Sequence, residues 1–137
     1  MTKQGIETPK APAAIGTYSQ GIRAGGAIWL SGQLPLDPAT GQLLTGDMRD
    51  QVRQVFRNLA AVAEAAGSSL DQAVKVTVFL VDLGHFTVVN EVMAEFCTKP
   101  YPARAASGVA GLPRGAAVEA EFGELPVFVP SSVHVVA

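Results

Sequence analysis

Hydrophobic residues recur at spacings of three and four in two stretches of the chain, which is the pattern of amphipathic helices. The first stretch runs from Asp47 to Ala66 and is followed by Gly67, a residue type that often ends a helix. The second stretch runs from Phe86 to Cys97. The apolar positions are Val52, Val55, Phe56, Leu59, Val62, Ala63 and Ala66 in the first stretch and Val89, Val92, Met93 and Phe96 in the second. The sequence therefore predicts two helices, each with one face in the core.

Five shorter stretches have the composition of β-strands. Residues 18–23 and 27–33 flank a glycine-bearing turn and predict a hairpin. Residues 73–81, "AVKVTVFLV", are apolar or β-branched at both alternating positions, which predicts a strand covered on both faces. Residues 103–109 and 116–122 are predicted to form a second hairpin across the turn "GLPRG". The strand order together with the two helices is ββαβαββ.

This order predicts an α+β fold in one domain, residues 1–137, with one sheet and two helices on a single face of it. The segment up to Gly16 is predicted to be an irregular arm, and "LPLDPATGQLL" a surface loop of fixed shape. From about residue 123 the chain continues as "GELPVFVPSSVHVVA". Prolines in this extension favour an ordered arm or an edge strand over a helix.

The predicted central strand also bears on assembly. Val74, Val76, Val78 and Leu80 alternate with Ala73, Thr77, Phe79 and Val81, so both faces of the strand are apolar. Two helices cover only one face of the sheet. A second copy of the chain would cover the other, and we expect a homo-oligomer with sheets packed face to face. The alternative is a monomer with a mildly apolar open face.

Composition and charge narrow the class of protein. A chain of 137 residues with 48% hydrophobic content can build a core, and a net charge of −2 gives no general attraction to nucleic acid or anionic lipid. The N-terminus has no apolar signal region, and the apolar runs are shorter than the ~20 residues that cross a bilayer. Cys97 is the single cysteine, so no intrachain disulfide can form. We expect a soluble cytoplasmic protein.

Arg104 is the first candidate for chemistry. In an extended strand its side chain shares one face with Ala106 and Gly108, which are small and leave room for a guest. The planar guanidinium suits two parallel hydrogen bonds to a carboxylate. The plain alternative is a structural ion pair with Glu119 or Glu121 across the predicted hairpin.

Other kinds of site receive weaker support or none. The segment "SGQLPLDPATG" follows a strand and could present backbone N–H groups to an anion, which alone is a weak signal. His85, His134 and Cys97 are too few and too widely spaced for a zinc deaminase site. Cys97 ends an apolar helix stripe and is predicted to be a small core residue rather than a nucleophile. Glycine-rich phosphate loops of the nucleotide-binding kinds are missing.

Four blocks of sequence, in this order, resemble the RidA family of reactive intermediate deaminases, formerly called YjgF. They are "APAAIGTYSQGI", "SGQLPLDPATG", "FTVVNEVMAEF" and "YPARAASGVAGLPRGAAVEAE". The resemblance covers nearly the whole chain. It implies a homotrimer with a chorismate-mutase-like fold and clefts between subunits. It also implies hydrolysis of enamines and imines such as 2-aminoacrylate to 2-keto acids and ammonia, with no cofactor.

The resemblance assigns a role to matching residues. Arg104 would clamp the substrate carboxylate, and Glu119 would orient or deprotonate the attacking water. The implied substrate-binding positions are Tyr18, Ser31, Gly32, Asn90, Arg104 and Ala106. Taken without the resemblance, Tyr18 and Ser31 could be ordinary residues at strand ends, and Asn90 could lie on a helix surface.

The chain departs from the family pattern in two places besides the C-terminal extension. Thr17 stands where the family often has proline, which loosens the approach to Tyr18. Ala106 stands where many members have Cys or Thr, so one wall contact is lost and the cleft is expected to be roomier. These departures bear on substrate range more than on chemistry.

Two rival functions remain open. Arg49, Arg53 and Arg57 are four residues apart on the first predicted helix and could form a basic stripe for RNA, since RNA cleavage is ascribed to some relatives. The other rival is a non-catalytic protein that senses 2-keto acids through Arg104. The sequence favours the deaminase over both.

Overall fold

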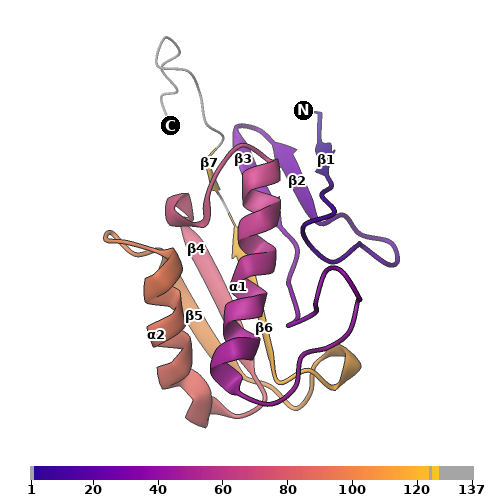
Figure 1. The fold of residues 1–137 in the computed structure, drawn as a ribbon. Helices are drawn as coiled ribbons and strands as arrows, with labels where there is room; N and C mark the ends of the chain where they lie inside the picture. The colour runs from indigo at the N-terminus through magenta and orange to yellow at the C-terminus, as the bar shows by residue number, and fades with distance from the viewer. Residues whose placement is uncertain (1, 124, 127–137) are drawn as a thin grey trace.

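In the computed structural model, which describes residues 2–123 and 125–126, two helices cover strands arranged in two small sheets (Figure 1). The sheet orders are β1-β2-β3-β7 and β5-β4-β6. The elements are β1 Gln4–Ile6, β2 Gly21–Ala24, β3 Ala27–Leu30, α1 Met48–Ala65, η1 Leu70–Gln72, β4 Lys75–Leu80, η2 Leu83–His85, α2 Phe86–Phe96, β5 Ala103–Gly108, η3 Pro113–Gly115, β6 Val118–Gly123 and β7 Leu125–Pro126.

Both predicted helices are confirmed, with the predicted ends. The carboxylate of Asp47 caps α1 by accepting a hydrogen bond from the backbone N–H of Arg49 at 2.7 Å. At the other end Gly67 has a φ of 84°, a left-handed conformation that costs glycine little. The apolar stripe of α1 is buried against the sheets, and α2 buries Val89, Val92 and Met93. The helices therefore form through the local apolar periodicity that the sequence displays.

The predicted single sheet is replaced by two sheets joined by one bridge. The backbone N–H of Gln33 donates to the carbonyl of Ala120 at 2.9 Å, and Ala120 returns the bond at 3.3 Å. The arm predicted to be irregular contains β1, which pairs with β2. In the C-terminal extension, Leu125 and Pro126 form the edge strand β7 beside β3. The remainder of the extension, residues 127–137, lies outside the described residues.

The predicted hairpin of residues 103–109 and 116–122 is wrong. β4 lies between the two strands, with β5 parallel on one side and β6 antiparallel on the other. Helix α2 connects β4 to β5 and returns the chain to its starting end, which forces a parallel pairing. The chain then crosses to the free edge of β4 before β6 begins.

The two faces of β4 differ in burial. Val76, Val78 and Leu80 point towards the helices and are fully buried, whereas Thr77 and Phe79 point the other way and are half-buried. In the neighbouring sheet the exposed fraction of Trp29 is 46%. The prediction that β4 is covered on both faces is thus met on the helix face only. Within the described residues, neither helix is long and apolar enough to span a membrane.

Candidate active site

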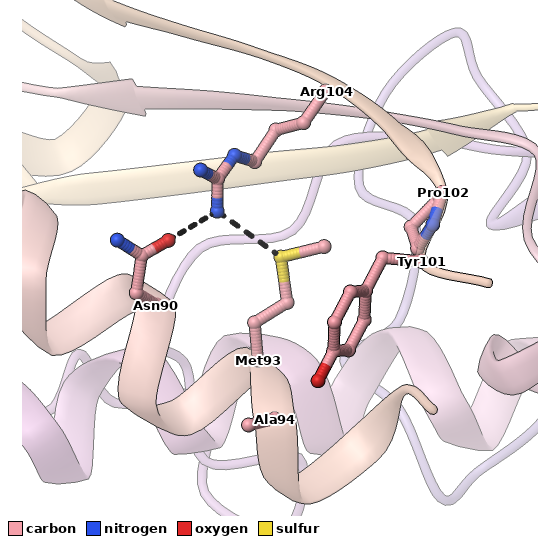
Figure 2. Close-up of a pocket in the computed structure, with 6 residues that line it drawn as sticks. All are labelled: Asn90, Met93, Ala94, Tyr101, Pro102 and Arg104. Carbon is pink, nitrogen blue, oxygen red and sulfur yellow. Dashed lines mark hydrogen bonds between the residues drawn. The ribbon is translucent and has the colours of Figure 1, made fainter. Parts of the chain in front are cut away.

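Arg104 lies on the helix face of β5, where three side chains of α2 hold its guanidinium. Figure 2 shows two of them, Asn90 and Met93. Its Nη1 donates to the amide oxygen of Asn90 and lies 3.8 Å from the sulfur of Met93. Its Cζ lies 4.7 Å from the centroid of the Phe86 ring, a cation–π distance. These positions are four and three residues apart along α2, so they share one helix face.

All three partners of Arg104 are uncharged, so its positive charge has no counter-ion in the part of the chain that the structure describes. Among the ion pairs of the described residues, none involves Arg104. Its Nη2 and Nε have no hydrogen-bond partner among the described residues. These two nitrogens form one edge of the planar guanidinium. This edge can donate two parallel hydrogen bonds to a carboxylate.

A cavity of about 360 Å³ adjoins the guanidinium, and we call it the Arg104 cavity. It lies between the C-terminal half of α2 and the segment that leads into β5 (Figure 2). Its lining residues are Asn90, Met93, Ala94, Tyr101, Pro102 and Arg104. The space predicted beside Gly108 is filled, because a Cβ there would lie 3.1 Å from Leu83. Ala106 is half-buried against the core.

Glu119 lines a second and larger cavity, of about 740 Å³, which we call the Glu119 cavity. Tyr18 and Gly32 line it as well, so it gathers three of the predicted site residues. Burial, and to a lesser degree the like charge of Glu121, raise the pKa of the Glu119 carboxyl above its usual range. A carboxylate with a raised pKa is a better base, which suits proton transfer with water.

Gly32 allows Glu119 to sit directly against the backbone. A Cβ at position 32 would lie 2.7 Å from Oε1 of Glu119, a distance that side chains do not tolerate. The absence of a side chain at Gly32 therefore determines where the carboxylate rests. This is a close approach of the kind that only glycine permits.

Hydrogen bonds fix the two segments that border the Glu119 cavity. The hydroxyl of Ser31 donates to the carbonyl of Ser19, and the hydroxyl oxygen of Tyr18 accepts from the backbone N–H of Ile15 at 3.3 Å. Behind the next loop, the buried amide of Asn58 on α1 donates to the carbonyls of Leu34 at 3.2 Å and Leu36 at 2.9 Å. Ser31 and Asn58 thus stabilise, through hydrogen bonds to carbonyls, the backbone segments beside the Glu119 cavity.

The structure does not bring Arg104 and Glu119 together within one chain. Arg104 is paired in register with Val76, whose side chain lies under the helices. Glu119 is paired with Phe79, whose side chain lies on the opposite face. Because strand side chains alternate between faces, the two groups lie on opposite faces of the sheet. The alternative left open for Arg104, a structural ion pair with Glu119 or Glu121, is therefore not found among the described residues.

The sequence profile described as "Endoribonuclease L-PSP" matches residues 8–123. This chain is a member of the RidA family. A RutC family protein of Pyrococcus horikoshii is 47% identical over 87% of this chain and 94% of its own length. The protein of Dermatophagoides farinae named 2-iminobutanoate/2-iminopropanoate deaminase is 44% identical over 87% of this chain and 93% of its own. The crystal structure of RidA from an Antarctic Psychrobacter species has a TM-score of 0.85 at 50% identity and covers 89% of this chain and 98% of that one.

Within this RidA-family site, the sequence analysis missed residues that the structure brings to the two cavities. Phe86 and Met93 hold Arg104, although Met93 was predicted only as a core position. Phe86 and Met93 lie four and three residues from Asn90 on the same helix, and this spacing indicates a shared face. Local sequence does not show that this face contacts Arg104 on β5. Arg114, taken only as part of a turn, lines the Glu119 cavity.

Cys97 and two of the arginines on α1 have structural roles in this RidA-family chain. Burial, and then the charge of Asp71, raise the pKa of the Cys97 thiol to about 11, as expected of a core residue rather than a nucleophile. Two arginines of the predicted basic stripe are paired with α2: Arg49 with Glu91, and Arg53 with Glu95 through two bonds of 2.9 Å. No group of three potential metal ligands occurs among residues 2–123, 125 and 126.

Proposed function

We propose that this RidA-family protein hydrolyses small α-imino acids, such as 2-iminobutanoate and 2-iminopropanoate, and their enamine tautomers to 2-keto acids and ammonia. The observation that carries the proposal is the guanidinium of Arg104, held by neutral groups with one edge open beside a cavity. A deaminase of this name, from Dermatophagoides farinae, is 44% identical to the chain. The proposed reaction needs no cofactor.

Binding begins with the substrate carboxylate on the open edge of Arg104. Asn90 and Met93 occupy Nη1, so the carboxylate meets Nη2 and Nε in a fixed orientation. The imine carbon is one bond away from that carboxylate. Its position is therefore set by the guanidinium, which lowers the entropic cost of attack by water.

Hydrolysis then requires one base, and Glu119 supplies it. Glu119 removes a proton from water while the oxygen forms a bond to the imine carbon, and it passes that proton to the imine nitrogen, which becomes an amine. Glu119 then removes the proton of the new hydroxyl group and passes it to the amine, so that the carbonyl forms as the carbon–nitrogen bond breaks and ammonia leaves. The imine and water thus give the 2-keto acid and ammonia with no redox change. The backbone N–H of Ser31 already donates to the carbonyl of Gln20 at 3.0 Å, so the N–H of Gly32 would hold a polar atom of the substrate.

The proposed site is shared between two chains. Arg104 and Glu119 lie on opposite faces of the sheet in one chain, so both reach one substrate when a second copy places its Glu119 face against Arg104. The half-covered face with Phe79 and Trp29 offers apolar surface for such packing. We propose a homotrimer with three such sites and a cytoplasmic location. Substrate and product are then the only small-molecule partners.

The rival functions receive less support. For RNA cleavage, two of the three arginines on α1 already pair with glutamates of α2, which leaves Arg57 as the remaining member of the stripe. A keto-acid sensor would bind its ligand through Arg104 and would need no base, so it leaves Glu119 in the second cavity without a role. Turnover separates the deaminase from the sensor.

The test couples the protein to threonine dehydratase and follows formation of 2-oxobutanoate. Wild-type protein is expected to accelerate it beyond the spontaneous rate. Arg104→Ala is expected to lower kcat/KM at least about 100-fold because the imine is no longer positioned. Arg57→Gln, which removes a charge on α1 away from both cavities, serves as the matched control. Equal rates in Arg104→Ala and wild-type protein would refute the assignment.

A further inference from the structure

A second guanidinium, that of Arg114, lines the Glu119 cavity, and the hydrolysis described above does not use it. Arg114 lies in η3 with φ 60° and ψ 18°. This left-handed conformation is uncommon for a residue with a side chain, and such outliers gather at binding sites. Glycine or asparagine would fit the backbone better. An arginine here suggests that its side chain has a use.

Within residues 2–123, the side chain of Arg114 is anchored at one nitrogen. Its Nη1 donates to the carbonyl of Gly41 at 3.1 Å, across the loop that borders the cavity. None of the ion pairs formed by residues 2–123 includes Arg114. Its remaining N–H groups are therefore available to an anion in the cavity.

The rest of the cavity makes this charge stand out. Among the described residues that line it, Arg114 is the single cationic one and Glu119 the single anionic one. Much of the remaining wall is apolar: Ile15, Leu34, Leu36 and Pro113. The volume of about 740 Å³ exceeds what a three- or four-carbon imino acid needs, since cavities of ~300–1,000 Å³ hold drug-sized ligands.

We propose that Arg114 is a specificity-determining residue that favours imino acids whose side chain ends in a second carboxylate. The inference rests on the proposed function, because the first carboxylate is placed on Arg104 of the adjoining chain. The second carboxylate then meets a guanidinium that is already held in place by Gly41. An imino acid with a short apolar side chain gains no affinity from Arg114.

A purely structural role for Arg114 has a different signature. If the guanidinium only ties η3 to the loop at Gly41, its loss disturbs the cavity for every ligand alike. If Arg114 determines specificity, its loss lowers the affinity only for ligands with two carboxylates. The ratio of the two affinities therefore separates the roles.

The experiment measures Kd by titration calorimetry for two stable reaction products, 2-oxobutanoate and 2-oxoglutarate. Binding is compared for wild-type protein, Arg114→Asn and Arg114→Lys, with Arg57→Gln as a charge-matched control. Asparagine tolerates the left-handed backbone, and lysine keeps the charge. The ratio of the Kd for 2-oxobutanoate to that for 2-oxoglutarate is expected to fall about 10-fold in Arg114→Asn, the loss of one charge-assisted contact. Lysine should retain part of the ratio, and Arg57→Gln all of it.

An unchanged ratio in Arg114→Asn, or wild-type protein that does not bind 2-oxoglutarate, would overturn the inference. The dehydratase-coupled assay on the same preparations tests the proposed function separately. Binding without hydrolysis of 2-iminobutanoate would reject the proposed function. Hydrolysis with an unchanged affinity ratio would reject only the role of Arg114.

Discussion

Asn90 holds Arg104 without neutralising it, and this choice of residue matters for binding. An aspartate at the same place would form an ion pair with the guanidinium and compete with an incoming carboxylate. The amide oxygen of Asn90 accepts the hydrogen bond from Nη1 while the net charge stays positive. The ring of Phe86 adds attraction that does not occupy an N–H group. Neutral groups thus hold the guanidinium in position, and the guanidinium keeps its positive charge for the substrate carboxylate.

Gly32→Ala is expected to displace the Glu119 carboxylate, because the new Cβ would lie 2.7 Å from Oε1. A displaced base is expected to lower kcat/KM about 10- to 100-fold, with little change in the melting temperature. The matched control is Gly5→Ala in β1, where the Cβ would meet only Ser19 Oγ at 3.8 Å. Full activity in Gly32→Ala would show that the position of Glu119 is not critical.

The pH dependence of catalysis is expected to follow Glu119. As a base it works in its carboxylate form, so kcat/KM falls as the pH drops through its pKa. Glu121 contributes to the raised pKa, and Glu121→Gln removes that like charge. The acid limb of the kcat/KM profile should therefore move to lower pH. Glu64→Gln, an exposed change on α1, should leave the limb in place. A limb that stays fixed in Glu121→Gln would exclude Glu119 as the titrating group.

At the scale of elements, local periodicity made the helices predictable and non-local pairing made the strands difficult. The apolar stripes of α1 and α2 are visible in any short window, and both helices form where expected. The pairing of β5 depends on α2 returning the chain to the start of β4, which a turn motif between β5 and β6 does not reveal. β1 has three residues, of which two are exposed, so it carries almost no hydrophobic pattern.

For the candidate site, the sequence indicated individual residues but not how they are arranged in space. Small neighbours singled out Arg104, and the resemblance named some of the lining residues: Asn90 and Arg104 in one cavity, and Tyr18, Gly32 and Glu119 in the other. Neither revealed that Arg104 and Glu119 lie on opposite faces, because that depends on the register of β5 and β6 against β4. The contacts of Arg104 with α2 depend equally on how the helix packs on the sheet.

Asn58 links α1 to the loop that frames the Glu119 cavity, and its loss should weaken the fold. Asn58→Ala removes the two hydrogen bonds that the amide nitrogen donates to the carbonyls of Leu34 and Leu36, and the one that the amide oxygen accepts from Gln54 at 2.8 Å. Leaving these part-buried groups without a partner is expected to cost about 2 kcal/mol of unfolding free energy. Urea unfolding at one fixed protein concentration measures this cost, with Glu64→Ala, an exposed change on the same helix, as control. A cost below that of the control would remove Asn58 from this role.

At the scale of the whole molecule, the open face of the β5-β4-β6 sheet is the reason why we propose a site completed by a second copy. The helix face holds Arg104, and the open face holds Glu119 next to half-buried Phe79. Packing one chain's open face against the Arg104 edge of another would bury apolar surface and complete the site in one step. On this proposal, activity depends on assembly, because one chain alone does not bring Arg104 and Glu119 to the same substrate.

Subunit complementation tests the shared site most directly. Arg104→Ala and Glu119→Gln are each expected to be inactive alone in the dehydratase-coupled assay. When the two variants are unfolded together in equal amounts and refolded as mixed oligomers, a site regains both groups if each variant supplies its intact residue. Random assembly should then restore about a quarter of the wild-type activity. A refolded mixture no more active than either variant alone would contradict a site shared between chains.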